Sequence, residues 1–164
     1  MPYTNTQSIT ATDMNNLLRG LYRDNTTRST SGTGEDDLGS LTIGANTIGA
    51  TGSIEVLVCG TVTGAAGNKT IKLYFGGTAI ITTATAAGTS DWMLRARISN
   101  TATGAQRIFV EWSDHQSATN FNKDYTTLAI DTTASAILKV AAECANGADV
   151  VSQTMMEVQV QQIT

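Results

Sequence analysis

From Ser40 onward, apolar and polar residues alternate in short segments that glycine-containing turns separate. In Lys69–Phe75, for example, isoleucine, leucine and phenylalanine occupy every second position. Alternation with period two is typical of a β-strand with one buried face. About eight or nine such segments follow one another at spacings near ten residues. The predicted strands are Leu41–Ile43, Gly52–Thr63, Lys69–Phe75, Thr78–Thr83, Asp91–Ser99, Gln106–Ser113, Tyr125–Ile130, Ser135–Cys144 and Val150–Ile163.

A series of strands without intervening helices limits how the sheets can form. Parallel strands need long crossover connections, which are usually helical, so the sheets should be antiparallel. We therefore predict an all-β protein built as an antiparallel β-sandwich, of which the jelly roll is the eight-stranded version. Both tryptophans, Trp92 and Trp112, fall on inward positions and are predicted to lie in the core.

Two of the predicted strands have no polar face. Gly52–Thr63 and Ser135–Cys144 carry apolar or small residues on both sides. A strand at the surface of a monomeric sandwich should carry polar residues on its outer side. We therefore expect one sheet to pack against neighbouring subunits in a homo-oligomer.

Residues 1–39 have a different pattern, which we interpret as an N-terminal arm joined to a β-sandwich domain at residues 40–164. Over about residues 12–23, apolar side chains recur at helical spacing and predict a short helix. A helix this short must dock on its own domain, on another subunit or on a larger particle. The candidate particle-anchoring residues are Met14, Leu17, Leu18, Leu21 and Tyr22. Asp24–Gly39 is polar almost throughout and predicts a linker or long loop.

The residues capable of catalysis or metal binding form no recognised motif. His115 follows Asp114, but neighbours on a strand point apart, and no nucleophile-elbow motif is present. The acidic segment Glu35–Asp37 lacks the spacing of a calcium loop, so we expect a solvated loop, with a weak cation site as the alternative. Cys59 and Cys144 read as small buried residues, and a disulfide between them is the alternative. We expect no enzymatic activity, metal or cofactor.

Charge and hydropathy exclude two classes of partner. The net charge is −4 and no basic tract occurs, which disfavours binding to a nucleic-acid backbone. No apolar stretch is long enough to cross a bilayer, and the N-terminus lacks the pattern of a signal peptide, so we expect synthesis in a cytoplasm. A loop at Ser117–Asp124 and the residue after it could instead provide an exposed contact surface. The candidate contact residues there are Phe121, Asp124 and Tyr125.

Several motifs resemble, in their order along the chain, small structural domains of bacteriophages. Leu41–Gly49 (LTIGANTIG) is followed by Gly52–Val56 (GSIEV) and Asn68–Thr78 (NKTIKLYFGGT). Such domains occur in tail fibres, head fibres and capsid decoration proteins, and the resemblance covers residues 40–164. Ile9–Asn15 is similar to the attachment arms of phage fibre proteins. The chain departs from the pattern at Gly44, where proline is expected.

The resemblance implies a jelly-roll-like fold, a place on the virion surface and frequent trimerisation, and it implies no catalytic residues. We therefore expect a phage virion structural protein, either a capsid decoration (cement) protein or a short head fibre. It would act through contacts with itself, as a homotrimer, and with the major capsid protein or other virion proteins. The alternative is a tail-fibre or receptor-binding protein that recognises a glycan on the host surface.

Overall fold

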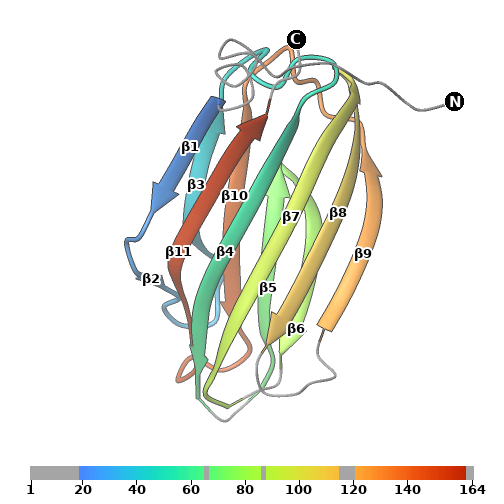
Figure 1. The fold of residues 1–164 in the computed structure, drawn as a ribbon. Coiled ribbons are helices and arrows are strands. Elements are labelled where there is room, and N and C mark those ends of the chain that lie inside the picture. The colour runs from blue at the N-terminus through green and yellow to red at the C-terminus, as the bar shows by residue number, and fades with distance from the viewer. Residues whose placement is uncertain (1–18, 65–66, 86–87, 115–120, 162–164) are drawn as a thin grey trace, which may run out of the picture.

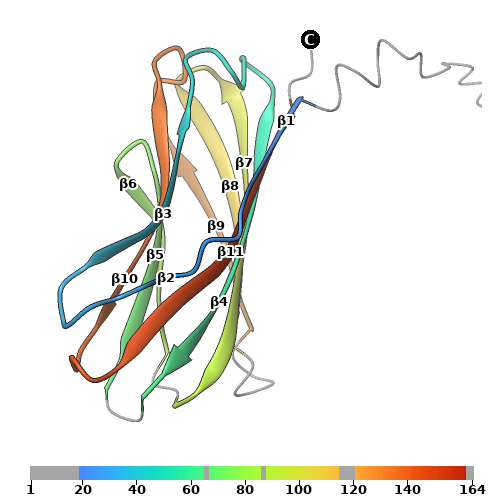
Figure 2. The ribbon, with the colours of Figure 1, turned by 90° about the vertical axis from the view of Figure 1, so that its left-hand side faces the viewer.

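The computed structural model describes residues 19–64, 67–85, 88–114 and 121–161, and of residues 19–20 and 121–123 the backbone alone. The described chain is all-β, with two antiparallel sheets packed face to face (Figures 1 and 2). Within it, no helix is long and apolar enough to span a bilayer. The strands are β1 (Arg19–Asp24), β2 (Arg28–Ser29), β3 (Asp36–Ile43), β4 (Ser53–Thr63), β5 (Lys69–Phe75), β6 (Thr78–Thr85), β7 (Ser90–Ala102), β8 (Ala105–Asp114), β9 (Phe121–Leu128), β10 (Ala136–Cys144) and β11 (Val150–Gln161).

The two sheets differ in width. The seven-stranded sheet has the order β1-β11-β4-β7-β8-β9, with β2 also paired to β11, and the four-stranded sheet has the order β3-β10-β5-β6. Strands β7, β8 and β9 follow one another as a meander, so β8 and β9 extend the wider sheet beyond β7 (Figure 1). The wider sheet therefore presents a broad outer face.

The core lies between the sheets and is built from alternate residues of each strand, as the alternation predicts. In β4 the even-numbered residues from Ile54 to Val62 are buried, and the odd-numbered ones lie on the outer face. Trp92 and Trp112 are buried side by side, with ring centroids 5.8 Å apart. Every strand predicted from Leu41 onward is present, because side-chain direction alternates in any strand regardless of its neighbours.

The helix predicted over about residues 12–23 is wrong in its described part. Arg19–Asp24 forms β1, which pairs with β11 and places Tyr22 opposite Val158. Leu21 and Tyr22 therefore lie on opposite faces of the sheet: Leu21 is 63% exposed, whereas Tyr22 packs against the core. The edge of β11 offers backbone hydrogen bonds along its whole length, whereas a short helix is marginal by itself. Three candidate anchoring residues lie outside the described residues: Met14, Leu17 and Leu18.

The segment predicted as a polar linker, Asp24–Gly39, lies against the sandwich. Strand β2 pairs with β11. The Thr30 amide then donates to the Val151 carbonyl over 2.9 Å, and the Val151 amide donates to the Thr30 hydroxyl over 3.0 Å. Polar residues here bond to the backbone and not only to water. Residues 19–39, assigned above to the arm, thus share both sheets with the rest of the chain.

A buried polar network closes one end of the sandwich. The Gln106 side chain accepts a hydrogen bond from the Ile130 amide (2.8 Å) and donates to the Ile130 carbonyl (2.9 Å). It also donates to Asn100, whose own amide donates to the Gly49 carbonyl and to the Thr132 hydroxyl. The network ties three connections together: β3 to β4, β7 to β8, and β9 to β10.

Candidate contact surface

The outer face of the seven-stranded sheet is organised in rows of side chains that cross the strands. The register of the strand pairs makes consecutive residues in a row direct cross-strand neighbours, close enough to touch. The first row, from β1 to β9, is Leu21, Gln159, Glu55, Arg97, Phe109 and Tyr125. The second row is Arg23, Glu157, Leu57, Arg95 and Glu111. The third row is Met155, Cys59, Met93 and Ser113.

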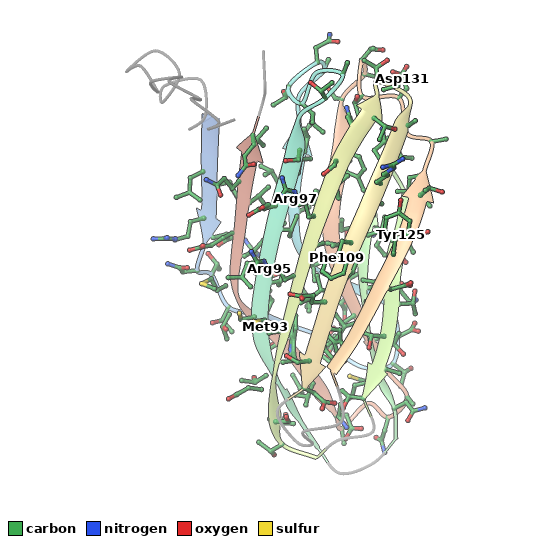
Figure 3. All side chains as sticks on the ribbon, turned by 45° about the vertical axis from the view of Figure 1, so that its right-hand side comes forward. Met93, Arg95, Arg97, Phe109, Tyr125 and Asp131 are labelled. Atoms are coloured by element: carbon green, nitrogen blue, oxygen red, sulfur yellow. The ribbon has the colours of Figure 1, made fainter. Side chains whose placement is uncertain are left out.

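The first row is apolar and exposed at both of its ends. Leu21 is 63% exposed at the β1 end. Phe109 and Tyr125, which are direct partners on β8 and β9, are 42% and 60% exposed at the other end (Figure 3). Among the described residues, one further large hydrophobic side chain is exposed, Ile137, and it lies on the four-stranded sheet. Exposed apolar side chains thus gather on one face.

The charges of this outer face are arginines, glutamates and one aspartate, Asp91, which is the cross-strand partner of Thr61. Arg23 pairs with Glu157 over 2.6 Å, and Arg97 approaches Glu55 at 3.4 Å. Arg95 and Arg107 are exposed on β7 and β8. No lysine occurs among the residues of this face whose side chains the structure describes.

The middle of the face is shallowly hollowed. A depression of about 350 Å³ is lined by residues that include Leu21, Leu57, Met93, Arg95 and Glu157. A neighbouring depression of about 240 Å³ lies between Arg97, Phe109 and Glu111, together with Glu55 and Arg95. Both are open grooves and not enclosed cavities. No group of three or more histidine, cysteine, aspartate or glutamate residues that could hold a metal occurs in the described part of the chain.

Cys59 lies near the centre of this face, with Met155 and Met93 as its cross-strand neighbours. Burial, and secondarily the charge of Glu157, raise the pKa of the Cys59 thiol. Cys144 is buried between the sheets on β10, and both cysteines are free. The alternative of a Cys59–Cys144 disulfide is therefore wrong, because the two thiols lie on different sheets and face different sides.

The outer face of the four-stranded sheet differs in its cations, which are lysines paired with carboxylates. Lys72 contacts Glu35 at 2.7 Å, and Lys139 contacts Asp37 at 2.8 Å. The Tyr74 hydroxyl donates to Glu35 over 3.0 Å, and the ammonium of Lys139 lies 4.8 Å from the Tyr74 ring centroid. The acidic segment expected to be a solvated loop thus forms an ion-pair network, since two lysines from neighbouring strands reach its carboxylates.

Two of the three predicted contact residues are resolved in detail. Phe121, Asp124 and Tyr125 belong to strand β9, not to a loop. Tyr125 points outward beside Phe109, whereas Asp124 lies opposite the inward Val110 and is exposed because β9 is an edge strand. The Phe121 side chain and His115 are outside what the structure describes. Asp114 is buried on the inner face of β8, so it does not form a surface site.

The sequence alone did not indicate that Phe109, Arg97 and Leu21 belong to one surface. Phe109 stands between two inward residues, Ile108 and Val110, in an unbroken apolar run. The sequence feature that indicates such a surface is an apolar side chain at an outward position of a strand. We interpreted this feature as a contact face in β4, but not in β8.

Comparisons with known proteins identify no family. No protein-family model matches this sequence, and no curated protein sequence is significantly similar to it. One similar solved structure is the CBM2 module of the evolved Dit of Lactobacillus casei BL23 phage J-1, at 10% identity and a TM-score of 0.40, over 76% of this chain and 70% of that chain. Another is dimeric latent PorU from Porphyromonas gingivalis, at 13% identity and a TM-score of 0.40, over 89% of this chain and 13% of that chain. A third is the VP2 subviral particle of infectious bursal disease virus, at 16% identity and a TM-score of 0.33, over 87% of this chain and 33% of that chain.

Proposed function

We propose that this chain is a structural protein of a bacteriophage particle, acting through protein–protein contacts as a capsid decoration protein or a short head fibre. The observation that carries the proposal is the composition of the outer face of the seven-stranded sheet. Protein interfaces are enriched in aromatic residues, methionine and arginine and are depleted in lysine. This face holds Phe109, Tyr125, two methionines and four arginines, whereas the lysines of the other face are paired with carboxylates.

The strand order supports the proposal. When β2, β8 and β9 are set aside, the remaining strands, numbered along the chain, pair in the orders 1-8-3-6 and 2-7-4-5. This is the order of a jelly roll, a fold used by viral capsid and lectin domains. One fold hosts many functions, so the strand order adds an analogy, and the surface carries the argument.

The phage-like motifs occupy structural positions that explain their residues. In Leu41–Gly49, Ile43 and Ile48 are buried where β3 leaves its sheet. Asn68–Thr78 contains β5 and the tight turn into β6, in which Gly76 and Gly77 have positive φ angles of 57° and 81°. The residues on which the resemblance rests therefore have structural roles in this fold.

A second candidate is a receptor-binding protein that recognises a host glycan. The observation in its favour is the exposed ring pair Phe109 and Tyr125 beside the groove that Arg97 and Glu111 line. Sugar rings bind to aromatic faces next to groups that form hydrogen bonds, and this groove offers both. A glycan array on the purified protein tests this candidate directly.

The test of the proposed function is the amount of the protein in purified phage particles. Quantitative mass spectrometry should find it in numbers comparable to the major capsid protein if it is a decoration protein, and in few copies if it is a fibre. Immunogold labelling would then show whether it lies on the capsid, the neck or the tail. Its absence from washed particles would overturn the proposal.

The attachment role of the N-terminal segment is part of the proposal. Removal of residues 1–18 deletes no residue of β1 to β11, so we expect the truncated protein to fold. It should lose binding to particles that lack the full-length protein. A truncated protein that binds particles as well as the full chain would assign attachment to the sandwich itself.

A further inference from the structure

We infer that the occupant of the outer face of the seven-stranded sheet is a second copy of this chain. The inference rests on the proposed function and names the partner of the same surface. It is carried by four properties of that face: the division of its charges, the position of its apolar ends, its uncharged centre and its area.

The charges divide the face into two unlike halves. On β1, β11 and β4, two carboxylates, Glu55 and Glu157, stand against one arginine, Arg23. On β7 and β8, three arginines stand against two carboxylates, Asp91 and Glu111, so this half has a net positive charge. When two copies meet so that the negative half of one faces the positive half of the other, opposite charges come together. Such charge complementarity directs association.

The apolar ends of the first row fit the same arrangement. When the β4–β11 half of one copy meets the β7–β8 half of another, Leu21 comes to the end that carries Phe109 and Tyr125. These three side chains are among the most exposed hydrophobic groups of the described chain. Their mutual burial removes from water the apolar surface that an isolated subunit leaves exposed.

The centre of the face is suited to exclusion of water. Leu57, Cys59, Met93 and Met155 are all partly exposed and uncharged there. Arginines and glutamates lie around them, which gives the apolar core and polar rim of a protein interface.

The face also has the area that a stable contact between copies needs. Six strands at about 4.8 Å spacing and about ten residues at 3.3 Å per residue give a patch of roughly 24 by 33 Å, near 800 Å². A standard interface buries about 800 Å² on each partner. When unlike halves meet over the whole face, the contact closes a pair about a two-fold axis.

The experiment is the mass of the purified full chain by light scattering, with matched variants. The wild-type protein should have a multiple of the 17.2 kDa chain mass. Leu21→Arg and Tyr125→Arg, at opposite ends of the first row, should each shift the mass toward 17.2 kDa. Ile137→Arg is the matched control, because Ile137 is 52% exposed on the outer face of the other sheet. It should keep the wild-type mass.

Labelling of the thiols provides a second readout on the same face. In the assembled protein a maleimide should label Cys59 slowly, and in Tyr125→Arg it should label Cys59 at least tenfold faster. Cys144 is buried in the core and should stay unlabelled in both, which shows that the variant is folded.

Three outcomes overturn the inference. They are a wild-type chain that is monomeric at micromolar concentration, an oligomer that both first-row variants leave intact, and an oligomer that Ile137→Arg alone dissociates. A monomer that still occurs in phage particles would leave the proposed function standing. An oligomer that is absent from particles would overturn the proposed function and leave the self-association intact.

Discussion

Lys69 Nζ lies 3.1 Å from Asp149 Oδ2, and the two side chains are 0% and 2% exposed. Lys69 begins β5 in the four-stranded sheet, and Asp149 directly precedes β11 in the seven-stranded sheet. The chain passes close to the pair at Gly64, whose φ is +102° and where a Cβ atom would lie 2.0 Å from Asp149 Oδ1. The ion pair therefore joins the two sheets at one end of the sandwich.

Removal of one member of this pair should be strongly destabilising. Lys69→Met leaves a buried carboxylate without its cation and should lower the free energy of unfolding by about 3–5 kcal/mol. The double variant Lys69→Met/Asp149→Leu removes both charges and should recover most of that loss. Urea denaturation of the three proteins measures the difference. A single variant as stable as wild type would show that the pair is hydrated in solution.

Two buried glutamines should respond in opposite ways to the same substitution. Gln106 is 1% exposed and its amide is hydrogen-bonded to Ile130 and Asn100. Gln106→Met leaves those groups unpaired and should lower the free energy of unfolding by about 1–3 kcal/mol. Loss of protection in hydrogen exchange at Ile130 would confirm the cause. An unchanged stability would mean that the network does not hold this end of the sandwich.

Gln153→Met is the matched substitution, and we expect it to raise the free energy of unfolding instead of lowering it. Gln153 is 0% exposed, and neither its amide oxygen nor its nitrogen has a hydrogen-bond partner within the described residues. The amide packs closely on Gly39, where a Cβ atom would lie 2.6 Å from its oxygen. Replacement by an apolar side chain of similar shape should raise the free energy of unfolding by about 1–3 kcal/mol. A lower free energy of unfolding for Gln153→Met would show that the Gln153 amide is hydrogen-bonded in solution.

Glu35 should make stability depend on pH in the acid range. The hydrogen bond from Lys72, and then that from Tyr74, lower the pKa of Glu35 below its ordinary 4.5, against the opposing effect of burial. A carboxyl group with a lowered pKa in the folded state stabilises the protein fully above the unfolded value. That contribution is lost as the pH falls through the folded pKa.

The comparison of wild type with Glu35→Gln isolates this effect. Wild type should have the higher melting temperature at pH 7, and the difference should shrink as the pH is lowered below about 4.5. High salt should reduce this difference in melting temperature at neutral pH, because salt screens the ion pairs of a surface network. A difference that is the same at every pH would contradict the ion-pair explanation.

The strands from Leu41 onward were predictable from local sequence, but the N-terminal strand β1 was not. The difference is whether the spacing of apolar residues fits one secondary structure or two. In Lys69–Phe75 the alternation fits a strand and no helix. Around Leu21 and Tyr22 the apolar spacing is compatible with both structures, and the choice depends on whether a strand edge is available. That edge belongs to β11, near the other end of the chain.

The exposure of the outer face was predictable in part. Tyr125 was expected to be exposed and is exposed, whereas its partner Phe109 lies within an apolar run and looked like core. Which side of a two-sided apolar strand is covered depends on the opposite sheet, and that sheet comes from distant parts of the chain. The same holds for Glu35, whose lysine partners lie on β5 and β10.

The sequence by itself determined the strands from Leu41 onward and their inward faces, because side chains of a strand alternate in direction whatever lies beside it. Only the tertiary structure decided which strands became neighbours, and hence that Leu21, Glu55, Arg97 and Tyr125 form one row and that Lys69 meets Asp149. Pairing and register are non-local, because they are set by the burial of both sheets in a shared core.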